Sequence, residues 1–215
     1  MNCCQCEGIE REFNRKGVAK ELEDYRRKGF ESLDKTTRVL IDALKAQGIE
    51  GMTLLDIGGG IGAIQHELLS HGASSAMQVD ASSAYVEAAK EEAQRLGLSD
   101  RVKHYHADFV NLAANIEQAD IVTLDKVVCC YHDMKRLVGL SSAKARRFYG
   151  LVYPRDRWWI GFGLFIFNFV QLLRRSPFRS FLHPTAAVAA ITRENGLKEC
   201  FYDRHFWWQV VVYSR

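Results

Sequence analysis

Short apolar runs alternate with segments of helical apolar spacing along most of the chain. Within residues 52–153 the runs are four to six residues long, as is typical of strands buried in a parallel sheet. Between the runs, apolar residues recur three or four positions apart, which predicts helices. The predicted strands are Met52–Ile57, Ser75–Val79, Val102–His106, Ile121–Leu124, Phe148–Tyr153, Leu197–Tyr202 and Trp207–Tyr213. The predicted helices are Ile61–His71, Ser82–Leu96, Asp133–Arg147 and Thr185–Asn195.

This alternation predicts an α/β fold with a doubly wound, mostly parallel seven-stranded sheet. The last two strands are joined by a turn near Asp203–His205, which is too short for a helical crossover. We therefore expect the sheet to end in an antiparallel strand pair. Such an ending separates the chain from an ordinary nicotinamide-binding fold.

The N-terminal part precedes this pattern and is predicted to be helical after a loose tail at residues 1–8. Residues 9–30 are rich in charge, with apolar residues at near-helical spacing. A second helix is predicted from Asp34, a plausible N-cap, to Gln47, with Gly48 ending it. We predict a helical cap over residues 1–48 and a ligand-binding α/β domain over residues 49–215.

One long apolar stretch, Trp158–Leu173, is interrupted only by Asn168 and Gln171. Its 16 residues fall short of the roughly 20 that span a bilayer. A buried core helix is the favoured interpretation. A helix lying on a membrane surface and a lid over an apolar substrate pocket are the alternatives.

Composition and charge set few further limits. The chain has 215 residues, 47% of them hydrophobic, which suits a globular protein with one sizeable core. A net charge of +3 without a basic tract gives no reason to expect nucleic acid as a partner. The six cysteines do not form a secreted disulfide pattern, and the N-terminus lacks a signal-peptide core. We expect a cytoplasmic protein, with peripheral membrane contact through residues 158–173 as an alternative.

The segment Asp56–Gly62 places four glycines in five positions where a strand gives way to a helix. Glycines there permit a sharp turn and the close approach of a ligand. Such a loop also occurs in dinucleotide-binding enzymes, but Asp56 at its entrance would repel a pyrophosphate. Its charge would instead favour the ammonium group of a methionine moiety.

Two more acidic residues follow predicted strands. Asp80, with Ala81 after it, can accept hydrogen bonds from both hydroxyls of a ribose, or it can merely cap the next helix. Asp108 can accept a hydrogen bond from an adenine amino group while Phe109 packs on the purine, or it can be a solvated loop residue. Together the two carboxylates favour an adenosine ligand.

The runs LLDIGGGIG, QVDAS, HADF and DIVTLD are similar, in order and spacing, to class I S-adenosylmethionine-dependent methyltransferases. The resemblance covers roughly residues 50–130 and implies S-adenosylmethionine as the cofactor. It implies the following roles: Asp56, Gly58, Gly59 and Gly60 at the methionine end, Asp80 and Ala81 at the ribose, Asp108 and Phe109 at the adenine, and Leu124 and Asp125 near the methyl group.

The segment TLDKVVCCY resembles the corresponding stretch of magnesium-protoporphyrin O-methyltransferases. Those enzymes tend to have a histidine where this chain has Cys129. The difference argues against a porphyrin substrate.

Methyl transfer from a sulfonium needs a general base only when the nucleophile must lose a proton. The candidates are His132 and Tyr131 after the fourth strand, and His183 before the final helix. A surface position for His132 is an equal alternative. Cys129 and Cys130 are favoured as core thiols, and thiolate-assisted methylation of a soft metalloid, together with Cys3, Cys4 and Cys6, is the alternative. The cysteine spacing gives no reason to expect a structural zinc.

We therefore expect methyl transfer from S-adenosylmethionine to a small, hydrophobic acceptor, leaving S-adenosylhomocysteine. A cofactor-binding sensor or partner-binding module without catalysis is the alternative of a different class. Asp56 and the antiparallel ending argue against a nicotinamide oxidoreductase. The sequence does not indicate an oligomeric state.

Overall fold

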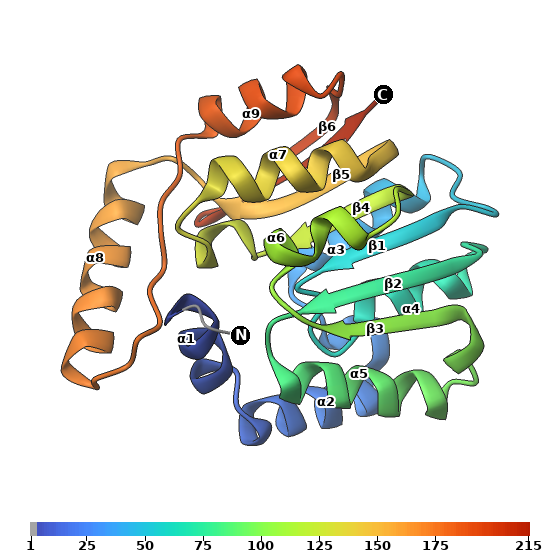
Figure 1. The fold of residues 1–215 in the computed structure, drawn as a ribbon, viewed down its shortest axis with the longest axis horizontal. Helices are drawn as coiled ribbons and strands as arrows, with labels where there is room; N and C mark the ends of the chain where they lie inside the picture. The colour runs from blue at the N-terminus through green and yellow to red at the C-terminus, as the bar shows by residue number, and fades with distance from the viewer. Residues whose placement is uncertain (1–3) are drawn as a thin grey trace.

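A seven-stranded sheet forms the centre of the protein in the computed structural model, which describes residues 4–215 and, from residue 7 on, their side chains (Figure 1). The strand order is β3-β2-β1-β4-β5-β7-β6, with β7 antiparallel to both of its neighbours and the other pairs parallel. The predicted fold class is thus confirmed. The strands are β1 (Thr53–Ile57), β2 (Ser75–Asp80), β3 (Val102–His106), β4 (Ala119–Asp125), β5 (Ala145–Pro154), β6 (Lys198–Arg204) and β7 (Trp208–Ser214).

Helices cover both faces of this sheet because successive side chains of its buried strands point to opposite faces. Leu54 of β1 joins a core with α3 and α4, whereas Leu55 joins a second core with α6, α7 and α9. The helices are α3 (Lys35–Lys45), α4 (Ala63–Ser70), α5 (Ser83–Arg95), α6 (Phe109–Leu112), α7 (Met134–Lys144) and α9 (Thr185–Glu194). Short 3-10 turns lie at Gly29–Ser32, Ser99–Arg101, Ala113–Asn115 and Val128–Cys130.

The N-terminus differs from the sequence prediction in two ways. Residues 4–8 belong to a helix, α1 (Cys4–Glu12), rather than to a loose tail, and α2 (Arg15–Lys28) is separate from it. The Asn14 side chain accepts hydrogen bonds from the backbone N–H groups of Lys16 and Gly17, so a new helix begins there. Tertiary contacts hold α1, because Glu10 accepts a hydrogen bond from the Ser83 N–H at 2.9 Å. Residues 1–3 lie outside the described residues.

The boundary between α7 and β5 is also displaced. The sequence predicts a helix up to Arg147, but α7 ends at Lys144 and the strand begins at Ala145. Ala145 pairs with Ala119 across a β-bulge in β4 that shifts the register. Tertiary pairing therefore overrides the local helical pattern. By contrast, Asp34 caps α3 as predicted.

The apolar stretch 158–173 forms one helix, α8 (Trp158–Leu173), but the favoured prediction of a buried core helix is wrong. Only Ile160 and Gln171 are buried along it. The helix stands at the edge of the molecule, away from the sheet, in the left part of Figure 1. Its length and apolarity do not reach what a bilayer span requires, nor do those of any other helix within residues 4–215.

Candidate ligand-binding site

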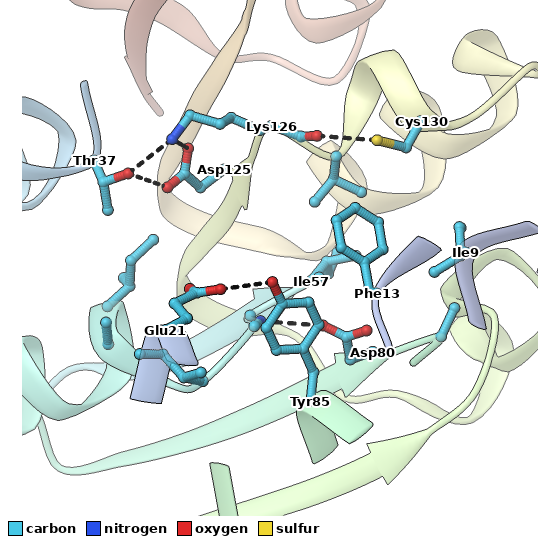
Figure 2. Close-up of a pocket in the computed structure, with 18 of the residues that line it drawn as sticks. Ile9, Phe13, Glu21, Thr37, Ile57, Asp80, Tyr85, Asp125, Lys126 and Cys130 are labelled. Atoms are coloured by element: carbon cyan, nitrogen blue, oxygen red, sulfur yellow. Dashed lines mark hydrogen bonds and ion pairs between the residues drawn. The ribbon is translucent and has the colours of Figure 1, made fainter. Parts of the chain in front are cut away.

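A cavity of about 630 Å³ lies at the carboxyl ends of β1, β2 and β4, where ligands bind in open α/β sheets. Helices α1 and α2 from the N-terminal region form part of its wall, through residues that include Phe13 and Glu21 (Figure 2). Most of the ligand-contacting residues predicted from the sequence meet here: Gly58, Gly59, Gly60, Asp80, Ala81, Asp108, Phe109, Asp125 and Tyr131.

The glycine loop requires glycine for steric reasons. Gly58 and Gly60 have φ values of +66° and +55°, in the left-handed region that favours glycine. A Cβ atom on Gly58 would lie 2.3 Å from the Val127 side chain, and one on Gly59 would lie 2.6 Å from Oδ2 of Asp56. The loop backbone therefore faces the cavity without intervening side chains.

Asp56 lies beneath this loop and is fully buried, so it does not form part of the cavity surface. Its Oδ1 accepts a hydrogen bond from the Thr123 hydroxyl at 2.7 Å, and its Oδ2 has no hydrogen-bond partner among the described residues. Burial raises the pKa of Asp56 to about 7, against the opposing hydrogen bond from Thr123. Leu124 is also fully buried and lies outside the cavity lining.

Because the folded-state pKa of Asp56 is raised, the protein should lose stability as pH rises and this carboxyl ionises inside the fold. Asp56→Asn removes the ionisation while keeping an oxygen that accepts from Thr123. Between pH 5 and pH 7 we expect the unfolding free energy of wild type to fall relative to the variant by about 2 kcal/mol. Urea unfolding at the two pH values measures this, with the exposed Asp100→Asn as the control. A pH-independent difference would contradict the burial argument.

Asp80 ends β2 with both carboxylate oxygens already placed. Its Oδ2 accepts from the Gly60 N–H at 3.1 Å and its Oδ1 from the Ser82 N–H at 2.8 Å. Burial raises the pKa of Asp80 to about 6, although these two hydrogen bonds oppose the rise. Ser82 is the residue that caps α5, so capping does not require Asp80. Each oxygen keeps a lone pair for a ligand hydroxyl.

Asp108 is buried, and the alternative of a solvated loop residue is wrong. It caps α6 by accepting from the Val110 N–H at 2.9 Å, and it accepts from the Tyr131 hydroxyl at 3.0 Å. Phe109 beside it is buried as well, and it contributes to the cavity wall. The Tyr131 side chain is thereby held at the cavity by its phenol oxygen.

The sequence analysis missed a carboxylate–phenol pair that faces the cavity. Tyr85 of α5 donates a hydrogen bond to Glu21 of α2 at 2.7 Å (Figure 2). Surrounding protein raises the pKa of Glu21 by desolvation, although the hydrogen bond from Tyr85 opposes the rise. Glu21 lies within a run of surface charges, so no sequence signal separates it from its exposed neighbours.

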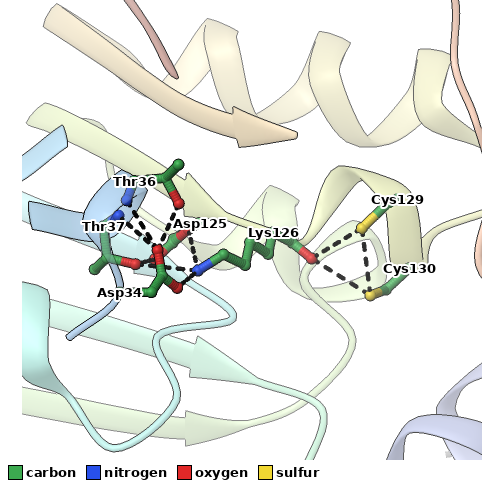
Figure 3. A network of polar contacts seen from close by, with 7 residues as sticks. All are labelled: Asp34, Thr36, Thr37, Asp125, Lys126, Cys129 and Cys130. Carbon is green, nitrogen blue, oxygen red and sulfur yellow. Dashed lines mark hydrogen bonds and ion pairs between the residues drawn. The ribbon is translucent and has the colours of Figure 1, made fainter. Parts of the chain in front are cut away.

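A second network, also missed, joins α3 to the end of β4 (Figure 3). Thr37 donates to Oδ2 of Asp125 at 2.5 Å, and Lys126 forms ion pairs with Asp34 and, at 3.6 Å, with Asp125. Burial raises the pKa of Asp125, and Lys126 opposes this rise. Burial would also raise the pKa of Asp34, but Lys126 lowers it to about 2. Lys126 has φ +60°, a costly conformation for a residue with a side chain.

Lys126→Met should leave the buried Asp125 carboxylate without its cation. We expect a loss of about 2 kcal/mol and a fall in Tm of roughly 4–8 °C at pH 7. Thermal unfolding followed by circular dichroism measures the change, with the exposed Lys135→Met as the control. Equal Tm values for the two variants would show that the ion pairs do not stabilise the fold.

The two histidines predicted as bases do not line the cavity. His132 is exposed and stacks on the Tyr131 ring, with the centroids 5.4 Å apart. His183 donates from Nε2 to the Tyr131 carbonyl at 2.9 Å, and burial lowers its pKa. Its nitrogen thus supports the loop behind Tyr131.

The adjacent cysteines take different positions. Cys129 is buried, as the core interpretation expects, whereas Cys130 lines the cavity. Their sulfur atoms are 3.9 Å apart. The side chains of Cys3, Cys4 and Cys6 lie outside the described residues, and with them the idea of a shared thiolate site.

Comparison with known sequences finds a methyltransferase domain at residues 54–145. A curated relative, the ribosomal protein L11 methyltransferase of Enterobacter sp. (strain 638), is 33% identical over 87 residues. The aligned part is 40% of this chain and only 29% of that protein, so the likeness is confined to the domain.

Solved structures share the fold over nearly the whole chain. Magnesium protoporphyrin IX methyltransferase from Synechocystis PCC 6803, with bound S-adenosylhomocysteine, has a TM-score of 0.72 and 20% identity, with 98% of this chain and 99% of that chain covered. Geranyl diphosphate C-methyltransferase from Streptomyces coelicolor A3(2) has a TM-score of 0.64 and 13% identity, with 83% and 76% covered. At such identities these likenesses bear on the fold.

Proposed function

We propose that this chain, which has the fold and the domain of the class I S-adenosylmethionine-dependent methyltransferases, transfers a methyl group from that cofactor to a small, hydrophobic acceptor. One observation carries the proposal. The glycine loop after β1, Asp80 after β2 and Asp108 after β3 line a single cavity, in the order that a methionine, a ribose and an adenine would need. The two structural relatives described above hold S-adenosylhomocysteine.

The charges around the cavity favour a cationic cofactor. Burial raises the pKa values of Asp56, Asp80 and Asp125, so an arriving positive charge stabilises their ionised forms. S-adenosylmethionine carries an ammonium and a sulfonium, whereas a dinucleotide would bring two phosphate charges against the same carboxylates. Asp56 acts here through its charge beneath Gly59 rather than by direct contact.

The cofactor would lie across three strand ends. The N–H and C=O groups of Gly58–Gly60 would hold the methionine end, and the Asp80 carboxylate the ribose hydroxyls. Phe109 would pack on the adenine while Asp108 accepts from its amino group through a remaining lone pair. Asp125, held by Thr37 and Lys126, would stand near the transferred methyl group.

The acceptor would enter beside α1 and α2, where Ile9, Phe13 and Leu33 give the cavity an apolar wall. An apolar wall with few polar groups favours a hydrophobic small molecule. Geranyl diphosphate, bound in the Streptomyces enzyme, is a small molecule with an apolar chain.

Methyl transfer from a sulfonium is an in-line displacement, so the protein's main contribution is to align the acceptor atom with the methyl carbon. An acceptor hydroxyl would also have to lose a proton. Glu21 is the carboxylate placed for that step, because it faces the cavity and its raised pKa makes it a stronger base than an ordinary glutamate. Tyr85 would orient it through their hydrogen bond.

Formation of S-adenosylhomocysteine from S-adenosylmethionine, with a panel of prenyl, quinone, polyketide and tetrapyrrole acceptors, tests the proposal. We expect turnover that depends on one acceptor class. Tight cofactor binding by calorimetry without turnover on any acceptor would instead favour a sensor or partner-binding module. Failure to bind the cofactor at all would overturn the whole proposal.

A further inference from the structure

Helix α8 presents a continuous apolar surface to solvent. Trp158 is 80% exposed, Phe162 61% and Phe165 67%, values expected of charged rather than aromatic side chains. Further along the helix, large apolar side chains remain exposed to its end. We call the following residues the α8 face: Trp158, Phe162, Phe165, Ile166, Phe169, Leu172 and Leu173.

The turn between β6 and β7 adds to this apolar surface. A Cβ atom on Gly163 would lie 2.5 Å from the Trp207 ring, so the turn packs directly against α8. Phe206, next to Trp207, is 69% exposed. The apolar surface therefore extends from the helix onto the neighbouring hairpin, and it is broader than a single helix stripe.

Positive charge lies at both ends of the α8 face. Arg157 precedes the helix and Arg174 and Arg175 follow it, all three exposed. The sequence has no acidic residue between Asp156 and Glu194. An apolar surface bounded only by basic side chains matches the boundary between lipid tails and anionic headgroups.

Two other occupants fit this surface less well. The helix has 16 residues, about 24 Å at 1.5 Å per residue, and cannot cross a hydrocarbon core of about 30 Å. In a twofold pairing of two copies, parallel or antiparallel, arginines of one α8 would meet arginines of the other. With no acidic residue nearby to neutralise them, such a pairing is electrostatically unfavourable.

We propose that α8 docks the protein flat on an anionic lipid bilayer, with the α8 face in the interfacial region and Arg157, Arg174 and Arg175 on the headgroups. The helix is held firmly enough for this. Asn168 of α8 both donates to and accepts from the backbone of Ser180, at 2.8 and 2.9 Å.

Contacts link the docked helix to the cavity wall. Gln171 of α8 donates to Glu12 of α1 at 2.9 Å. The Phe178 ring packs edge-on between Phe167 of α8 and Phe13, a cavity-lining residue, with centroids 6.1 and 5.8 Å away. Docking through α8 therefore brings the α1 side of the cavity near the lipid surface.

Co-sedimentation with vesicles tests the proposal without cofactor or acceptor, so its failure would leave the proposed methyl transfer untouched. We expect wild type to bind vesicles of phosphatidylcholine mixed with phosphatidylglycerol, and to bind them less as salt rises. R174Q/R175Q should weaken this binding about 30-fold, since each arginine near an anionic surface contributes about one tenfold step. F162S/F165S should weaken it at least as much.

The matched control is L96S/Y202S, which removes two exposed apolar side chains outside the α8 face. Its binding should equal that of wild type, and all variants should keep the wild-type circular dichroism spectrum. Equal binding of wild type and F162S/F165S would overturn the proposal. So would a dimer in analytical ultracentrifugation that F162S/F165S abolishes while wild type fails to bind vesicles, because a second copy would then cover the face.

Discussion

Asp80→Ala should weaken binding of S-adenosylhomocysteine about 1000-fold. The ionised Asp80 carboxylate would accept hydrogen bonds from both ribose hydroxyls, and hydrogen bonds to a charged group contribute about 1.5–3 kcal/mol each. Losing two such bonds removes about 4 kcal/mol, which corresponds to three orders of magnitude in Kd. Isothermal titration calorimetry at pH 8 measures the affinity, above the raised pKa of about 6.

Asp80 also holds the Gly60 and Ser82 N–H groups, so the alanine variant loosens the loop as well. Asp80→Asn separates the two effects, because one amide oxygen can still accept a hydrogen bond. We expect its affinity to fall between those of wild type and Asp80→Ala, with native circular dichroism for both variants. Unchanged affinity in Asp80→Ala would remove the ribose assignment.

Glu21→Gln should lower kcat about 100-fold or more for an acceptor that must lose a proton, because a positioned base contributes at least that much. The affinity for S-adenosylhomocysteine should stay close to wild type, since Glu21 is placed on the acceptor side. Steady-state kinetics and calorimetry separate the two quantities. Glu23→Gln, an exposed neighbour on α2, is the control and should leave kcat unchanged.

The pH profile gives a second readout on Glu21. A base must be ionised, so the wild-type rate should rise with pH through the raised pKa of Glu21 and then level off. Tyr85→Phe removes the hydrogen bond that lowers this pKa, and should move the rise to higher pH. A Glu21→Gln variant with full kcat would show that Glu21 is not the base and that the acceptor needs none from it.

The sheet and the cofactor side of the cavity could be predicted from the sequence because their signals are local. Each strand is a short apolar run, and Gly58, Asp80 and Asp108 follow strands directly. The class I resemblance stated for residues 50–130 agrees with the domain found at residues 54–145. Parallel strands gather such residues at one edge without further information.

The acceptor side could not be predicted because it depends on contacts between distant segments. Glu21 and Tyr85 are 64 residues apart, and Thr37 and Asp125 are 88 apart. Each looks like an ordinary surface or helix residue until the fold brings its partner. The division at residue 48 stays a prediction, although α3 packs directly on the sheet.

Helix α8 shows the opposite failure. Its apolar composition predicts burial, yet the sheet is already covered by other helices, so most of α8 has no protein core to join. Sequence hydrophobicity reports that a side chain avoids water, and does not report whether protein or lipid covers it. His132 and His183 were chosen for their chemistry alone, and the loop geometry turns both away from the cavity.

The most direct test is a crystal structure of the chain with S-adenosylhomocysteine. The account predicts that its amino acid end lies over Gly58–Gly60 above the buried Asp56, with the ribose hydroxyls on Asp80 and the adenine against Phe109. A nucleotide diphosphate seated over the glycine loop, or an adenosyl ligand bound anywhere else, would contradict it.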